Sequence, residues 1–115
     1  MTIEELLIAY LSDNVDVGVF AERPKSSELP SSYILIEKLG GGKENHVRTA
    51  NIAIQSIAPT LLEAIKLNEQ VISIMPKMYG YPNIVSVAYN TDYNFTDTST
   101  KEYKYQALYD IKYII

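Results

Sequence analysis

The region from Tyr103 to Tyr113 alternates between apolar and polar residues with a period of two. Its odd-numbered positions are aromatic or aliphatic, and its even-numbered positions are polar apart from Leu108. Successive side chains of a strand point to opposite faces of a sheet, so this pattern predicts a long strand with unlike faces. The tyrosine stripe then either faces the helices of the domain or lines a subunit interface, where partly hydrated aromatic rings are common.

Four further strands are predicted, at residues 15–20, 33–38, 48–58 and 84–89. The second of these is apolar on both faces, which is typical of a strand that is covered on both sides. Because the helices of so small a domain cover one face of a sheet, a partner subunit is a natural source of the second cover. Residues 40–45 predict a flexible hairpin connection, and the polar residues 90–100 predict a loop.

Two helices are predicted from apolar residues at helical spacing and from their start signals. The first begins at Thr2, which has capping-box spacing to Glu5, and ends near residues 12–14. The second runs from about Thr60 to residue 75, where Pro76 stops it. The resulting order is α-β-β-β-α-β-β. It predicts a single α+β domain over residues 1–115, with a mixed or antiparallel sheet of about five strands and two helices packed on one face.

The charge and composition of the chain exclude several classes of function. The net charge is −4, from 14 acidic and 10 basic side chains. A specific nucleic-acid contact usually needs a basic face, so none is expected, although a small local basic patch is compatible with this charge. Cysteine is absent, which excludes disulfides and thiolate metal sites. No apolar run approaches the roughly 20 residues of a membrane span, so no membrane contact is expected.

Three motifs invite a chemical role, and each departs from the pattern that the chemistry requires. The glycine run 40–42 with Lys43 lacks the first glycine of a phosphate loop, and Glu44 stands where its hydroxyl residue belongs. Segment 92–97 lacks the turn glycine of a calcium loop. His46, the only histidine, lies at a predicted hairpin end with no nucleophile motif beside it, and is expected to be a solvated loop residue. We therefore expect no enzyme activity, no cofactor and no metal ion.

The order and spacing of several segments resemble those of the small tail-terminator, or head–tail joining, proteins of long-tailed phages, in particular those of Gram-positive hosts and their prophages. Together with the first helix, the resembling segments span nearly the whole chain. They are YILIEK at 33–38, AIQS at 53–56, LEA at 62–64, LNE at 67–69, DYNFTD at 92–97 and YQA at 105–107. The helix start at 59–60 and the turn at 79–82 have no match in that pattern.

The resemblance implies a virion structural protein. Such proteins form a ring, typically a hexamer, on the head-proximal end of the tail tube, where they stop tube polymerisation and dock the head connector. The implied partners are further copies of this chain, the tail tube protein and the head-completion or connector protein. The implied location is the virion tail, after synthesis in the host cytoplasm. The alternatives are another phage head-completion or tail-assembly factor, or a small ligand-binding domain or enzyme unrelated to phage, which needs a pocket with convergent polar groups.

A ring protein works through its interfaces, and charged loops on a rigid sheet are suited to docking. Two groups of charged side chains are therefore candidates for contacts with neighbouring copies or with the tube. The first group lies in the first loop and comprises Arg23, Lys25 and Glu28. The second group lies around the glycine run and comprises Lys43, Glu44 and Arg48.

Overall fold

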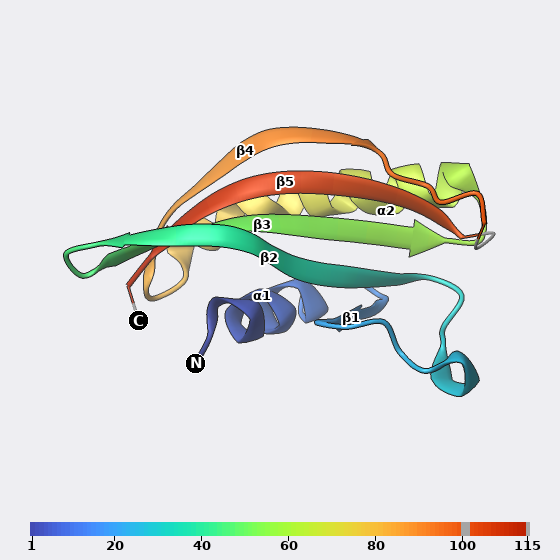
Figure 1. Cartoon of the computed structure of the whole chain (residues 1–115), viewed down its shortest axis with the longest axis horizontal. Coiled ribbons are helices and arrows are strands. Elements are labelled where there is room, and N and C mark those ends of the chain that lie inside the picture. The colour runs from blue at the N-terminus through green and yellow to red at the C-terminus, as the bar shows by residue number, and fades with distance from the viewer. Residues whose placement is uncertain (100–101, 115) are drawn as a thin grey trace.

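The computed structural model describes residues 1–99 and 102–114, and it has the predicted α+β architecture. A five-stranded mixed sheet carries two α-helices on one side (Figure 1). The elements follow one another as α1 (Ile3–Ser12), β1 (Gly18–Phe20), η1 (Ser26–Glu28), β2 (Tyr33–Glu44), β3 (Val47–Ala58), α2 (Leu61–Ile74), η2 (Met75–Gly80), β4 (Ile84–Asn94) and β5 (Tyr103–Tyr113), where η denotes a short 3-10 helix.

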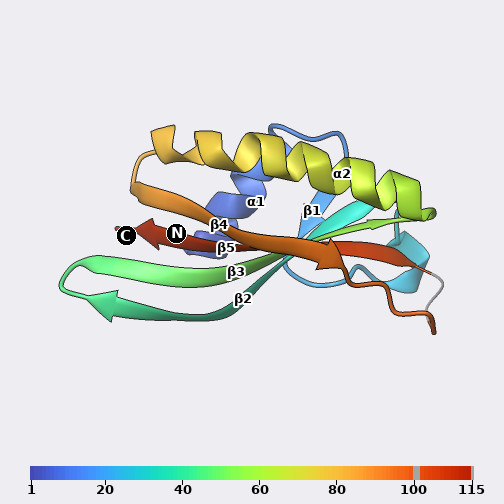
Figure 2. The same ribbon diagram turned by 90° about the horizontal axis from the view of Figure 1, so that it is seen from above.

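The strand order across the sheet is β1-β2-β3-β5-β4. β1 pairs with β2 in parallel, and all other neighbours are antiparallel. α2 packs on β3 and β5, whereas α1 packs on β1 and β2, and both helices lie on the same side (Figure 2). β4 forms one edge of the sheet over its whole length. Because β1 pairs only with Tyr33–Leu35, the rest of β2 forms the opposite edge.

The core lies between the two helices and the face of the sheet that they cover. Even-numbered residues of β3 and odd-numbered residues of β5 share this face, as the strand register requires. The tyrosine stripe is therefore the sheet face under the helices. Among its members Ala107, Tyr109, Ile111 and Tyr113 are buried, whereas Tyr103 is 40% exposed.

The start signals of both helices act as the sequence predicts. The Thr2 hydroxyl accepts a hydrogen bond from the backbone N–H of Glu5 at 3.1 Å, and the Glu5 carboxylate accepts one from the Thr2 backbone. The Thr60 hydroxyl accepts one from the backbone N–H of Glu63 at 3.2 Å. The second helix ends at Ile74, just before Pro76 as expected, and the chain continues through Pro76 as the 3-10 helix η2.

Three predicted boundaries are wrong. β2 does not end before the glycines. It continues through them to Glu44, because the backbone of β2 stays paired with that of β3 as far as Val47, the first residue of β3. The turn is confined to Asn45 and His46, and Asn45 adopts a left-handed conformation with φ of 56°. β4 likewise extends to Asn94, so part of the predicted polar loop is strand paired with β5. β1 is only three residues long.

The side of β2 that faces away from the helices is covered at Tyr33 by the chain itself. Tyr33 has no exposed surface, and its ring lies edge-on to that of Phe20, with 6.3 Å between the ring centroids. Its hydroxyl donates a hydrogen bond of 2.8 Å to the carboxylate of Glu102. At this position, therefore, the second cover does not require a partner subunit.

Tyr109 gives the core a pH-dependent stability. Its hydroxyl is buried and has no hydrogen-bond partner among residues 1–99 and 102–114. Burial, with smaller contributions from Tyr89 and Asp92, raises the pKa of Tyr109 from 10.0 to about 12. The unfolded chain releases this proton first, so the free energy of unfolding falls as the pH rises from 10 towards 12.

The change Tyr109→Phe is expected to preserve or raise stability at neutral pH, since it removes a buried hydroxyl that has no hydrogen-bond partner in the described part of the chain. It is also expected to reduce the loss of stability at alkaline pH. Urea unfolding of both proteins at pH 7 and at several values above 10 measures this, with Tyr79→Phe as the control, because Tyr79 is 70% exposed. An alkaline loss as steep in Tyr109→Phe as in the unaltered protein would contradict the assignment.

Candidate functional site, a basic hollow at the β2–β3 hairpin

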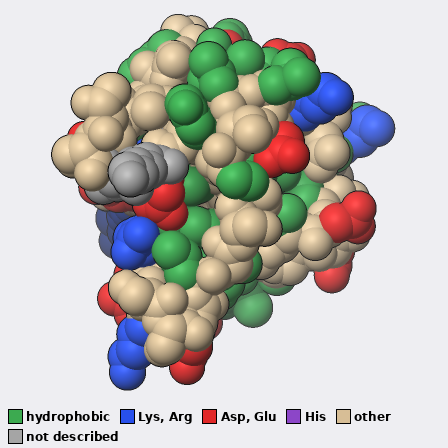
Figure 3. Space-filling model, turned by 90° about the vertical axis from the view of Figure 1, so that its right-hand side faces the viewer, with side chains coloured by type: hydrophobic (Ala, Val, Ile, Leu, Met, Phe, Trp, Pro, Cys, Tyr) green, Lys and Arg blue, Asp and Glu red, His purple; other side chains and the backbone are tan. Residues whose placement is uncertain are grey.

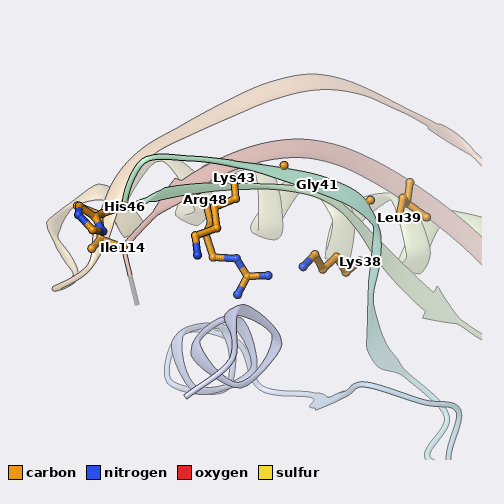
Figure 4. A pocket seen from close by; sticks show the side chains of 9 residues that line it. Lys38, Leu39, Gly41, Lys43, His46, Arg48 and Ile114 are labelled. Carbon is orange, nitrogen blue, oxygen red and sulfur yellow. The ribbon is translucent and has the colours of Figure 1, made fainter.

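The distal half of the β2–β3 hairpin forms an arm that reaches beyond both helices (Figure 1). An open hollow of about 920 Å³ lies along this arm, and we call it the basic hollow. Figure 4 shows the side chains of Lys38 and Arg48 on the side of the sheet that faces α1. The residues that line the basic hollow are Lys38, Leu39, Gly40, Gly41, Gly42, Lys43, His46, Arg48 and Ile114.

A β-bulge places the two lysines of the basic hollow on one face. Lys38 pairs with Ile52 and Lys43 pairs with Arg48, and the register shifts between Lys38 and Gly40. Residues five positions apart on a regular strand point to opposite faces. Leu39, the extra residue of the bulge, shifts the alternation of side chains by one position. Both lysines therefore lie on the same face as Arg48.

One glycine of the run is required by packing. A Cβ atom on Gly41 would lie 2.3 Å from the carbonyl oxygen of Thr49, which is closer than any real side chain approaches. A Cβ on Gly42 would meet nothing within 4 Å, and one on Gly40 would make an ordinary contact with the Asn51 side chain at 3.5 Å. Gly41 therefore allows β2 and β3 to stay close together beside the bulge.

The basic hollow is a local excess of positive charge on an acidic protein. It collects three of the chain's ten lysine and arginine side chains, and among the described residues no Asp or Glu side chain lines it. The Arg48 guanidinium lies over the Tyr113 ring, 5.5 Å from the centroid, which helps to fix its position. Within the described residues the only ion pair joins Arg23 to Glu102, so no described carboxylate pairs with the cations of the hollow. Their mutual repulsion favours the binding of an anionic group.

The structure separates the members of the second candidate group. Lys43 and Arg48 are cross-strand partners and line the basic hollow together. Glu44 pairs with Val47, one step further along the ladder, and so faces the other side of the hairpin. The two cations therefore belong to one site, and the carboxylate does not.

The first candidate group lies at the opposite end of the molecule from the hairpin tip (Figure 1). Arg23 forms an ion pair of 3.1 Å with Glu102, and this hydrogen-bonded carboxylate raises the pKa of Arg23. Glu102 also accepts the Tyr33 hydrogen bond. Glu28 is the last residue of η1, and Lys25 is the residue directly before η1. Both side chains are exposed. Both cations and carboxylates are present at this end (Figure 3), in contrast to the lining of the basic hollow.

Two polar side chains of the basic hollow, those of His46 and Lys38, were not predicted to belong to a site. His46 is exposed in the turn, as expected of a loop histidine, and it also lines one end of the hollow. Lys38 was assigned only to the end of a strand. No local signal identifies it, because its position beside Lys43 depends on the bulge at Leu39.

Other kinds of site receive less support. Within residues 1–99 and 102–114, no group of three His, Asp or Glu side chains is placed to hold a metal ion. A smaller hollow of about 190 Å³ lies between α2 and the segment before β1, and its lining includes Asp16, Glu63 and Lys66. None of the described helices is long and apolar enough to cross a membrane. The models of known protein families and the characterised proteins give no match to this chain.

Proposed function

We propose that the protein is a virion assembly protein of a long-tailed phage, acting as a tail terminator. In this role it forms a ring, a hexamer in the family that it resembles, which caps the tail tube, ends tube polymerisation and joins the tail to the head connector. The order and spacing of the resembling segments support the proposal. The five-stranded sheet with two helices on one side is also the architecture that the resemblance implies. The proposal includes no catalytic step.

The unprotected edge strand β4 is the observation that carries this proposal. Exposed apolar side chains follow one another along it and just beyond it: Val85 is 50% exposed, Tyr89 50%, Tyr93 38% and Phe95 47%. Edge strands of monomeric proteins are usually blunted by lysine, proline or inward charges. β4 contains no lysine and no proline, and Asp92 is its single charged residue. Such an edge favours burial against another protein chain.

Two bulges interrupt β4, and they limit where a partner can pair with it. They lie between Ile84 and Ser86 and between Tyr89 and Thr91, which leaves two regular stretches, residues 86–89 and 91–94. A copy that contacts this edge through a different part of its own surface makes a head-to-tail interface. Such an interface closes into a ring when the rotation between neighbours is a simple fraction of a turn.

The test is the solution mass by light scattering over a range of concentrations and salt. The unaltered chain is expected to form a defined species near six times its 13.0 kDa mass. The double variant Val85→Lys/Ala88→Lys, at exposed positions of the β4 edge, is expected to be monomeric, because lysine on an edge opposes strand pairing.

The matched control is Leu62→Lys, since Leu62 is 60% exposed on α2 and is expected to leave the mass unchanged. An unaltered protein that stays monomeric at every concentration would count against a self-assembling ring. A ring that survives both β4 lysines would rule out this edge as its interface.

A further inference from the structure

The edge of β2 that borders the basic hollow is open to a further strand. β1 occupies this edge only at Tyr33–Leu35, and within the described chain no other strand pairs with residues 36–44 on that side. Outward-facing backbone N–H and C=O groups on such an edge are a template for an extended peptide. The glycines at 40–42 carry no side chains that obstruct an approaching backbone.

The charges of the basic hollow flank this same edge. Lys38 and Lys43 project from β2 itself, and Arg48 projects from the neighbouring strand onto the same face (Figure 4). An added strand would therefore carry every second side chain over three cations. Carboxylates at those positions gain charge-assisted hydrogen bonds, which are about twice as strong as neutral ones.

We propose that the β2 edge at residues 36–44 binds an extended acidic segment of a partner protein. The segment adds to the sheet as a strand and places its carboxylates over Lys38, Lys43 and Arg48. The other face of the arm sets a second requirement, because Glu37 and Glu44 lie there. Acidic side chains are repelled on that face, so the segment that fits alternates acidic residues with neutral ones.

A peptide satisfies this site better than a nucleic acid does. Backbone N–H and C=O groups along a strand edge match those of another polypeptide, whereas a nucleic acid backbone has no such alternating groups. No Phe, Tyr or Trp lines the hollow, so unpaired bases have no aromatic ring on which to stack. The net charge of −4 also repels a long polyanion, whereas a short acidic segment meets mainly the local cations.

The inference does not depend on the proposed ring. The β4 edge and the β2 edge are opposite edges of the sheet, and strands β3 and β5 lie between β2 and β4. A partner can therefore occupy one edge without the other, and the two edges can be tested separately.

The test measures fluorescence anisotropy of a labelled peptide, as long as the open edge, in which glutamate alternates with threonine. Binding is expected to weaken as salt is added, and to weaken about tenfold or more in Lys38→Gln/Lys43→Gln/Arg48→Gln. The matched control is Lys25→Gln/Lys66→Gln/Lys77→Gln, which removes the same charge from exposed positions outside the hollow. Its affinity is expected to stay within about twofold of the unaltered protein.

Three further probes separate strand addition from simple charge attraction, and they apply to the unaltered protein. A peptide with glutamine in place of glutamate is expected to lose binding. A peptide that is N-methylated at every backbone nitrogen keeps its charge but cannot donate backbone hydrogen bonds to the edge, and it is also expected to lose binding. Equal binding of the N-methylated peptide, equal losses in the two triple variants, or no binding of the glutamate peptide would each overturn the proposal. Tighter binding of an oligothymidylate of equal charge would overturn it in favour of nucleic acid.

Discussion

Alanine at Gly41 is expected to lower the free energy of unfolding by about 1–3 kcal/mol, the usual cost of forcing extra volume into a packed position. The new Cβ would lie 2.3 Å from the Thr49 carbonyl oxygen, and that atom belongs to the backbone of the central strand β3. The strain cannot be relieved by a side-chain rotation. It is relieved only if the two strands separate or the bulge moves, and either change displaces Lys38 relative to Lys43.

The control for this change is alanine at Gly42, in the same strand and one residue away. Its Cβ would meet nothing within 4 Å, so stability is expected to be unchanged or slightly raised through the lower entropy of the unfolded chain. Chemical denaturation of both variants gives the comparison, and binding of the glutamate–threonine peptide gives a second readout. Equal stability and equal peptide binding for the two variants would show that the close approach of the strands is unimportant.

Alanine at Tyr33 is expected to lower the free energy of unfolding by about 3–5 kcal/mol, as for other large aromatic side chains removed from a core. Tyr33 is fully buried although no helix covers its side of the sheet. Removing the ring leaves Phe20 without its edge-on neighbour and takes the hydrogen bond from Glu102. Among the described residues, the ion pair between Arg23 and Glu102 then remains as the link between the first loop and the residue that precedes β5.

Phenylalanine at Tyr33 separates packing from hydrogen bonding. It keeps the ring and removes the hydroxyl, so the expected loss is about 1 kcal/mol. Alanine at Tyr79, which is 70% exposed, is expected to change stability by less than about 0.5 kcal/mol. Thermal and urea unfolding of the three variants test this order. A Tyr33→Ala protein as stable as Tyr79→Ala would mean that the outer face is not packed as described.

The features predictable from the sequence are those set by neighbouring residues. Thr2 and Thr60 mark helix starts because each hydroxyl bonds a backbone N–H three residues away. The alternation in β5 identifies the buried face because strand geometry alone sets the direction of its side chains. From such local rules the α+β class and the element order follow, whereas the alternation alone left open whether the tyrosine stripe faces the helices or a partner subunit.

The features that were not predictable depend on pairing between distant residues. The three glycines read locally as a turn, yet β3 holds them in a strand. The same holds at Asn94, which continues β4 because β5 offers it a partner at Tyr105. The basic hollow was only half predicted for this reason. Lys43 and Arg48 stand out as charges near a hairpin, but Lys38 joins them only through a register shift that no short pattern encodes.

The place of β5 in the sheet has a consequence for the order in which the protein can fold. β5 is the last strand in chain order, yet it lies between β3 and β4. Until the ribosome has made it, β3 has only one neighbour, β4 has none, and the helix α2 lacks half of the surface on which it packs. The hairpin of β2 and β3 can form early, but closure of the sheet must wait for contacts between segments far apart in the chain, which are slow to form. During that interval the apolar residues of β4 are exposed to other nascent chains, and the period of greatest aggregation risk falls between the synthesis of β4 and that of β5.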